Sequence, residues 1–235
     1  LQGGFSGLTI KTRAGEPFAL FGTAWQRDSL GNIVIDANTG LRKTLADQNL
    51  GNIAPDWNMG INNTLSYRGL SFSFLVDIRE GGVVWSGTNA ILRSTGLAKE
   101  TAVNRDKVII DRGVVLDGPS GKFIPNTIPV QSMQDFWGQF ATANTEANVF
   151  DASYVKLREA RLSYRIPTGF FNRHANFIKG IELGIEGRNL WIIKSYVPNI
   201  DPEVNLFGAQ SLGEGAEYYN VPSSRSFGVN LRVKI

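Results

Sequence analysis

The sequence predicts an all-β fold built mainly from antiparallel strands. Five segments alternate apolar and polar residues with period two, which is the pattern of a strand with one apolar and one polar face. Glycine contributes 26 of the 235 residues, above the usual share of about 7%, and aromatic residues contribute 11%. Because glycine favours turns, we expect many strands joined by turns and loops.

The composition excludes several functional classes. The chain has no cysteine and one histidine, His174, so it offers no disulfide scaffold, thiolate metal site or cysteine nucleophile, and a histidine-based triad is nearly impossible. Lys plus Arg number 24 and Asp plus Glu 21, which gives a formal charge of +3 and no footprint for nucleic acid. We expect no enzymatic activity, no cofactor and no nucleic-acid partner. His174 lies in a short connection and is expected to be a solvated turn residue.

The N-terminal segment carries no targeting pattern. Residues 1–15 lack a basic region followed by an apolar run, and no stretch of 18 uncharged apolar residues occurs anywhere in the chain. A membrane β-barrel also lacks such runs, because its strands alternate. The first residue is Leu1 rather than Met, so we expect it to lie inside a longer product.

The first predicted elements are short. Residues 16–28 resemble a strand that alternates poorly, and residues 31–36 and 41–46 suggest a hairpin that turns around residues 38–40.

Four residues with side-chain oxygens accompany this hairpin: Asp28, Asn32, Asp36 and Asn38. Calcium binds such oxygens, but the spacing does not fit the known calcium loop. Turn-forming Asp and Asn explain the pattern equally well, so we expect turns and no metal.

Residues 57–68 and 70–79 form the clearest hairpin, with a two-residue turn at Arg68-Gly69. This turn would place three apolar pairs on one face: Tyr67 with Leu70, Leu65 with Phe72, and Ile61 with Val76. In the long connection that follows, residues 131–143 predict a short helix with one apolar face. That face would carry Met133, Phe136, Trp137 and Phe140.

The remaining strands are expected at residues 159–166, 177–191 and 226–235. The alternation breaks at residues 152–158, which predicts either a bulge near Arg158 or a change of environment there.

The polar faces of these three strands carry complementary charges, namely Arg161 and Arg165, then Glu182 and Glu186, then Arg232 and Lys234. They predict either cross-strand ion pairs or an ordinary charged solvent face.

Connection lengths alternate. Residues 68–69 and 167–176 are short connections, whereas 80–150 and 192–222 are long. Short turns at one end and long loops at the other are typical of outer-membrane barrels, in which the short-turn end is periplasmic. The last strand ends on that side, so the C-terminus is expected to be periplasmic. Phe170, Phe171 and Phe177 could form an interfacial aromatic girdle or pack in a core.

Five motifs and the last strand now point to one family. The motifs are AWQRDSLGNIVID (Ala24 to Asp36), the run from Leu50 to Gly82, DASYVKLREARLSY (Asp151 to Tyr164), EGRNLW (Glu186 to Trp191) and DPEVNLFG (Asp201 to Gly208). In this order, and with the ending RSFGVNLRVKI, they resemble the C-terminal barrel region of SusC/RagA-type TonB-dependent transporters of Bacteroidetes-like bacteria. The resemblance extends from about Ala14 to Ile235, although outer-membrane proteins more often end in an aromatic residue.

The resemblance implies a 22-stranded transmembrane β-barrel with a plugged lumen, together with a signal peptide, a plug domain and a TonB-contacting segment. None of these three parts is found in residues 1–235, so we expect the chain to supply the last five or six strands and their long extracellular loops. Such a fragment alone would expose an apolar band, which outer-membrane lipid would cover, and two unpaired edges.

The implied function is import of oligosaccharides or peptides across the outer membrane. Its implied partners are a SusD-like surface lipoprotein and the TonB–ExbB–ExbD energy source. The polar face of the barrel strands would contact the plug through Arg161, Arg165, Glu182, Glu186 and Arg232.

The long loops are expected to face the substrate or the lipoprotein, because aromatic faces and amides suit sugars and peptides. The candidates are Trp85, Asn89, Phe136, Trp137, Asp201, Glu203, Asn205, Tyr218 and Tyr219. The same aromatic residues could instead pack the loops, and Asp201 and Glu203 more simply form a structural turn than a metal or acid–base cluster.

Two alternatives stay open. A soluble β-sandwich that binds carbohydrate requires Phe72, Phe74, Leu183, Leu231 and Val233 to be covered by a second sheet. A glycan-degrading enzyme requires a convergent pair of carboxylates in a cleft.

Overall fold

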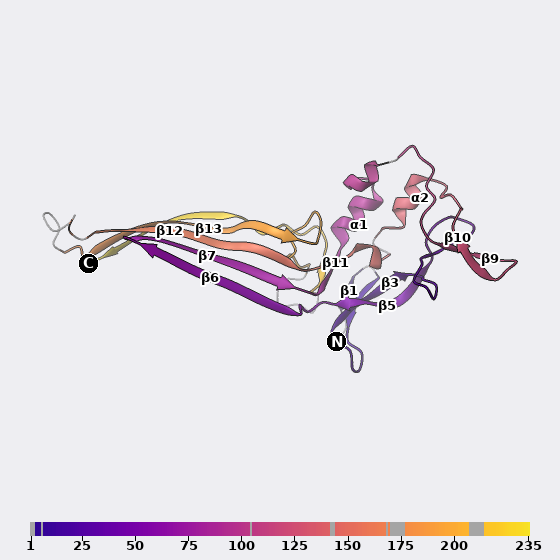
Figure 1. The fold of residues 1–235 in the computed structure, drawn as a ribbon, viewed down its shortest axis with the longest axis horizontal. Coiled ribbons are helices and arrows are strands. Elements are labelled where there is room, and N and C mark those ends of the chain that lie inside the picture. The colour runs from indigo at the N-terminus through magenta and orange to yellow at the C-terminus, as the bar shows by residue number, and fades with distance from the viewer. Residues whose placement is uncertain are drawn as a thin grey trace.

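The computed structural model describes residues 3–5, 7–103, 105–141, 144–167, 169, 177–206 and 214–235. The molecule is elongated, with a long sheet in one half and a compact body of short sheets and helices in the other (Figure 1). Among the described helices, none is long and apolar enough to cross a membrane. His174, Phe170 and Phe171 lie outside the described residues, so their predictions stay open.

The long sheet is antiparallel, with strand order β15-β13-β12-β7-β6. Its strands are β6 Trp57–Tyr67, β7 Leu70–Glu80, β12 Tyr154–Ile166, β13 Gly180–Ser195 and β15 Ser226–Lys234. These are the five segments whose alternation predicted strands, and that prediction is confirmed. The sheet is open among the described residues, with β6 and β15 at its edges.

The register of the first hairpin follows from its turn. Arg68 and Gly69 have φ angles of 46° and 87°, as a two-residue hairpin turn with two left-handed positions requires. The three predicted pairs of apolar residues are all observed. Glycine is needed at position 69 for a second reason, because a Cβ there would lie 2.9 Å from the carbonyl oxygen of Arg165.

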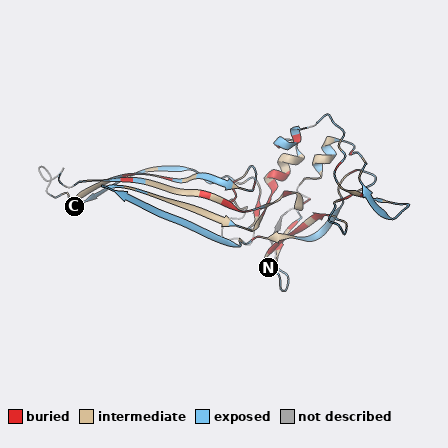
Figure 2. Ribbon diagram, in the orientation of Figure 1, coloured by how far each residue is buried: buried red, intermediate tan, exposed pale blue. Residues whose placement is uncertain are grey.

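The two faces of the long sheet differ in chemistry. One face, the apolar face, carries large exposed side chains: Met59, Ile61, Leu65, Phe72, Leu162, Leu183, Ile185, Val229 and Leu231. The other, the polar face, carries the alternate residues, which include Ser73, Asp77, Arg161 and Glu182. Figure 2 shows the long sheet as mostly exposed or intermediate, while buried residues concentrate in the compact body.

This exposure argues against the sandwich alternative. Phe72, Leu183, Leu231 and Val233 expose 39–63% of their surface, and no second sheet of the described residues packs over them. Phe74 is only half-buried.

A bulge interrupts β12 at Arg158. The pairing of β12 with both neighbours shifts register between Leu157 and Glu159. Strict alternation would place Lys156 and Arg161, which are five positions apart, on opposite faces. Because of the extra residue, both lie on the polar face. The predicted bulge is therefore confirmed.

The compact body contains three smaller sheets. The first has the order β1-β2-β3-β5, the second β10-β9-β4 and the third β11-β8-β14. Their strands are β1 Gly3–Phe5, β2 Leu8–Lys11, β3 Ala19–Trp25, β5 Thr44–Asn52, β10 Lys122–Pro125, β9 Val114–Asp117, β4 Val34–Ile35, β11 Val149–Asp151, β8 Val83–Ser86 and β14 Ala216–Glu217. The helices are α1 Gly87–Ser94 and α2 Met133–Gly138, with short 3₁₀ turns η1 Lys99–Ala102 and η2 Glu146–Asn148.

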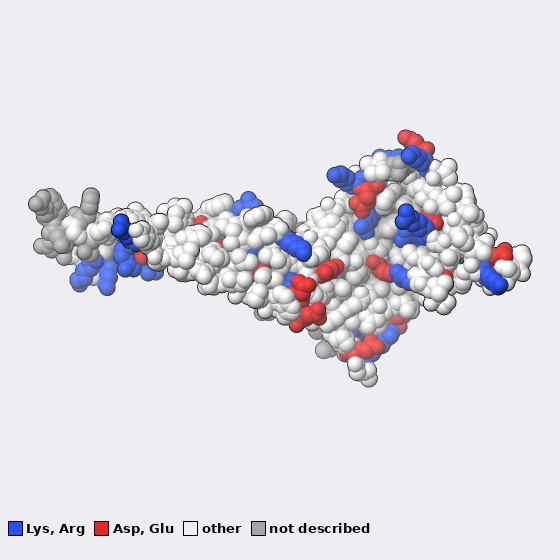
Figure 3. Space-filling view, in the orientation of Figure 1, with Lys and Arg blue, Asp and Glu red and all other residues white. Residues whose placement is uncertain are grey.

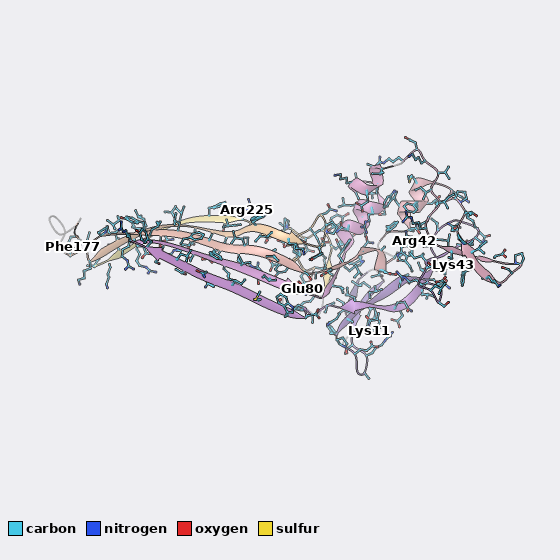
Figure 4. All side chains as sticks on the ribbon, viewed as in Figure 1. Lys11, Arg42, Lys43, Glu80, Phe177 and Arg225 are labelled. Carbon is cyan, nitrogen blue, oxygen red and sulfur yellow. The ribbon has the colours of Figure 1, made fainter. Side chains whose placement is uncertain are left out.

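The main hydrophobic core lies in this body around Trp85, whose side chain is fully buried. Arg42, labelled in Figure 4, adds an ion pair to this body: it binds Asp111 through two hydrogen bonds of 2.6 and 3.0 Å, and its guanidinium lies 5.0 Å from the centre of the Trp25 ring.

The predicted strand within residues 16–28 is β3. The predicted small hairpin is also observed, because the Asp36 N–H donates to the Leu41 carbonyl at 2.8 Å.

The chain ends and connections follow the predicted alternation. The C-terminus and the Arg68-Gly69 turn lie at the far end of the long sheet, whereas the connections after β7 and β13 enter the compact body (Figure 1). Figure 4 places Glu80 at the junction between the two halves and Phe177 at the far end. Both long connections therefore build one structure at a single end of the sheet.

Candidate functional site

A cluster of charged side chains lies on the polar face where the long sheet meets the compact body. We call Asp77, Lys156, Arg158, Asp201 and Glu203 the anchor cluster. Asp77 comes from β7, the two cations come from β12, and the last two carboxylates come from the connection between β13 and β15.

The ion pairs of the anchor cluster are shared. The Lys156 ammonium contacts both Asp201 and Glu203, and the Arg158 guanidinium contacts both Glu203 and Asp77. The Lys156 and Asp201 side chains expose only 4% and 3% of their surface. Three carboxylates thus face two cations, so the cluster is held by paired charges and additional hydrogen bonds.

Those hydrogen bonds come from Ser223 and Tyr154. The Ser223 hydroxyl and N–H both donate to Asp201, and the Tyr154 hydroxyl lies 3.1 Å from Glu203. The connection between β13 and β15 is therefore fixed to the long sheet at Asp201 and Glu203, and Ser223 ties its second half to Asp201.

Electrostatics keeps the two loop carboxylates ionised. Burial raises the pKa of Asp201, but hydrogen bonds from Lys156 and Ser223 outweigh it and leave the pKa below its ordinary value. Burial likewise acts against ionised Glu203, and hydrogen bonds from Arg158 and Lys156 lower its pKa overall.

The bulge explains why two cations converge here. Without it, strict alternation from Arg161 would send Lys156 and Arg158 to the apolar face. Sequence reasoning selected Asp201 and Glu203 but missed their cationic partners. The available signal was the break in alternation at residues 152–158 together with two basic residues inside it.

A second cluster ties the same connection to α1. The carboxylate of Glu217 is fully buried and accepts hydrogen bonds from the hydroxyls of Ser86 and Thr88. The Ser86 hydroxyl also caps α1 by accepting from the Asn89 N–H at 3.1 Å. Asn89 accepts from Asn199 at 2.8 Å, so the start of α1 holds both halves of the connection.

Most of the predicted loop candidates lie within this packing. Trp85 is fully buried and stacks on Tyr218, with ring centres 6.5 Å apart, while Asn89 is 2% exposed. The Asn205 carbonyl accepts from the Asn220 amide at 3.0 Å. Tyr219 differs from these candidates, because the residue is 57% exposed.

Phe136 and Trp137 lie on α2. They pack edge-to-face with ring centres 5.2 Å apart, and both also contact Phe140. The predicted helix is present but shorter than residues 131–143. Its aromatic face is half-buried rather than buried.

Farther from the compact body than the anchor cluster, the polar face carries the predicted charges. Arg161 pairs with Glu182 at 3.2 Å, and Arg165 lies 3.7 Å from the same carboxylate. Glu186 lies 3.7 Å from Arg188, while Arg232 occupies the register position opposite Glu182. Figure 3 shows Lys and Arg gathered near the end of the molecule that carries the C-terminus.

The oxygen-rich hairpin forms turns. Asp28 accepts from the N–H groups of Leu30 and Asn32, and Asp36 accepts from the N–H of Asn38. The Asn32 side chain lowers the pKa of Asp28 by hydrogen bonding. No group of three or more His, Asp or Glu side chains among the described residues is arranged to hold a metal ion.

A hollow of about 650 Å³, lined by polar and apolar residues alike, adjoins the anchor cluster at Asp201 and is bordered by Tyr219. Three of its lining residues, Asn189, Asn199 and Tyr219, have positive φ angles of 51°, 65° and 54°. Backbone conformations of this kind concentrate at binding sites and tight turns. Amide groups, the tyrosine ring and Arg225 provide its polar chemistry.

Comparisons with known proteins identify the fold. No family model matches the sequence. The RagAB peptide importer in its closed-closed state matches with a TM-score of 0.60 at 17% identity, over 97% of this chain and 24% of the matched chain. Its open-open state matches with a TM-score of 0.62 at 16% identity, over 98% and 23%.

One curated relative is similar in sequence. TonB-dependent receptor P3 of Formosa agariphila is 29% identical over 94 residues, which are 38% of this chain and 9% of the receptor. The chain thus spans about a quarter of the matched importer chains and a smaller part of the receptor. It has the fold of part of a SusC/RagA-type transporter.

Proposed function

We propose that this chain forms the C-terminal part of the wall and outer loops of an outer-membrane nutrient importer of the SusC/RagA type. The carrying observation is the two-faced long sheet. Its apolar face is exposed over all five strands, while its polar face bears charges and the anchor cluster.

The dimensions of the apolar face support a membrane location. The ten steps from Trp57 to Tyr67 correspond to about 33 Å along a strand, or about 25 Å of height at a barrel's usual tilt, which equals the apolar band of such proteins. Exposed aromatic residues occupy both ends of this band, with Trp57 at one end and Tyr67 and Tyr164 at the other. These rings suit the two membrane interfaces.

The remaining roles follow from the two faces. Arg161, Arg165, Glu182, Glu186 and Arg232 would face a plug inside the barrel. The compact body would lie outside the cell, where Tyr219 and the hollow that it borders would meet a SusD-like lipoprotein and an oligosaccharide or peptide. TonB–ExbB–ExbD would supply the energy. We propose no bond chemistry, because the carboxylates of the anchor cluster are engaged by cations rather than converging on an open cleft.

The test uses the complete importer that contains this chain, expressed with its lipoprotein partner. We expect it in the outer-membrane fraction, with a folded form that migrates differently from the heated form on gels. We also expect uptake of a labelled oligopeptide or oligosaccharide that stops when a protonophore collapses the proton gradient. Recovery as a soluble monomer, or uptake that ignores the protonophore, would contradict the proposal.

A tag after Ile235 tests the orientation. It should react with an impermeant antibody only after the outer membrane is permeabilised. Reaction on intact cells would place the C-terminus outside and reverse the proposed orientation.

A further inference from the structure

The apolar face of the long sheet is hollowed near its centre. The hollow has a volume of about 500 Å³ and spans four strands, β7, β12, β13 and β15. Its lining consists of Phe72, Ala160, Arg161, Leu162, Ile185, Glu186, Gly187, Leu190, Phe227, Gly228 and Val229. This volume lies within the range of about 300–1,000 Å³ that is typical of small-molecule pockets.

Two small residues create the hollow. Ala160 and Gly187 lie opposite each other in the ladder, in a row that continues to Phe74 on one side and Phe227 on the other. Alanine and glycine leave a gap in this row, which the rings of Phe72 and Phe227 line. Leu190 bounds the gap, because a Cβ added to Gly187 would lie 2.5 Å from the Leu190 Cδ2 atom.

The floor of the hollow offers a ligand no polar side chain to bind. Arg161, Glu186 and Gly228 alternate with the apolar lining residues, so they contribute backbone here while the two charged side chains extend from the polar face. Their backbone groups belong to the sheet ladder. All other lining side chains are aliphatic or aromatic.

We propose that this hollow holds a hydrocarbon chain of an outer-membrane lipid. The inference rests on the proposed function, which places the apolar face against the bilayer. The hollow is continuous with that face and lies between its two aromatic ends, where hydrocarbon is the surrounding medium. An empty gap would forfeit dispersion contacts with its walls, and a flexible chain fills an irregular apolar space. Among the residues that the structure describes, no charged side chain borders the gap on this face, so the lipid tail is bound rather than its headgroup.

The test maps contacts of the complete importer in phosphatidylethanolamine vesicles. A fraction of the lipid carries a photoactivatable diazirine on its acyl chain, and labelled peptides are located by mass spectrometry. We expect labelling to concentrate on the segments 157–162 and 185–190. Ala160→Phe should abolish this excess by filling the gap, and Ala160→Leu should reduce it.

Val233→Phe is the matched control, because it enlarges an exposed side chain of the same face outside the hollow. It should leave the excess labelling unchanged. Even labelling along the whole apolar face, labelling unaffected by Ala160→Phe and Ala160→Leu, or cross-links to a protein partner or second copy would overturn the lipid site.

The assembly state separates the two proposals. An importer that reaches the outer membrane and folds, but shows even labelling, contradicts only the lipid site. A protein that never assembles in the membrane contradicts the proposed function and the lipid site together.

Discussion

Lys156 shows how a single side chain connects two distant parts of the chain. It lies on β12 of the long sheet, yet both of its carboxylate partners belong to a connection that begins forty residues later in the sequence. Its near-complete burial makes the interaction sensitive to the loss of one partner, because an unpaired buried charge costs far more than a solvated one.

Lys156→Met should therefore loosen the connection between β13 and β15. We expect a destabilisation of about 3–5 kcal/mol, the usual cost of breaking a buried ion pair from one side. Limited proteolysis of the complete importer in membranes would show new cleavage near residues 196–206. Lys43→Met is the control, because Lys43 lies 3.8 Å from Asp36 with 45% of its side chain exposed, and its loss should cost about 0–1 kcal/mol. Equal resistance of wild type and Lys156→Met would contradict the role of the anchor cluster.

The anchor cluster should also fail in acid. Asp201 and Glu203 have lowered pKa values in the folded protein, so the unfolded loop binds more protons and acid favours it. The stabilisation is fully present above the pKa values of the unfolded chain, which are about 4. It is lost as the pH falls through the lower pKa values of the folded protein. Pepsin should therefore cleave the loop at about pH 2 and leave it intact at about pH 5. In the double variant Asp201→Asn, Glu203→Gln, cleavage should lose most of this pH dependence; an unchanged profile would exclude these carboxylates as its cause.

The sequence identifies individual residues unevenly. Asp201 and Glu203 stand out because they are acidic residues beside prolines in a long loop. The buried carboxylate of Glu217 gives no such sign, since its hydroxyl partners Ser86 and Thr88 lie about 130 positions earlier and belong to a helix start. Contacts between distant loops are set by the packing of the compact body, which local patterns do not encode.

At the scale of elements, the bulge in β12 determines which face each side chain occupies. Deleting Arg158 should remove the extra residue and make the ladder with β7 regular, because Leu157 already pairs with Val76 and Glu159 with Leu75. Lys156 would then lie four positions from Arg161 and stay on the polar face, so we expect the protein to assemble in the outer membrane and to lose only the pairs of Arg158 with Asp77 and Glu203. Arg158→Ala keeps the bulge and should lose the same two pairs. Heat-modifiability on gels compares the two variants, and failure of the deletion alone to assemble would contradict this geometry.

Strands with strict alternation were predictable from the sequence, whereas very short strands were not. The hairpin around Arg68-Gly69 follows from residue parity alone, because a two-residue turn leaves one register that unites the apolar side chains. The strands β8 and β14, by contrast, are a parallel pair from two different long connections. Two and four residues carry too little periodicity to predict pairing across 130 positions.

At the scale of the whole molecule, the two faces of the long sheet predict opposite responses to the same charge. Ile61→Arg places a guanidinium on the apolar face and should destabilise the assembled barrel by about 2–4 kcal/mol, as expected near the bilayer midplane. Asn62→Arg places it on the polar face, one residue away, and should be tolerated. The fraction of folded protein in the outer membrane measures both. Equal losses from the two variants would contradict a membrane on the apolar side.

The three-stranded sheet β11-β8-β14 has a consequence for how such a protein can diversify. It joins both long connections into one hydrogen-bonded unit, and Glu217 completes that unit by accepting from residues of the other connection. Recombination that exchanges a single loop would leave an incomplete sheet and a buried carboxylate without its donors. We therefore expect that a hybrid chain folds only when both connections are exchanged together.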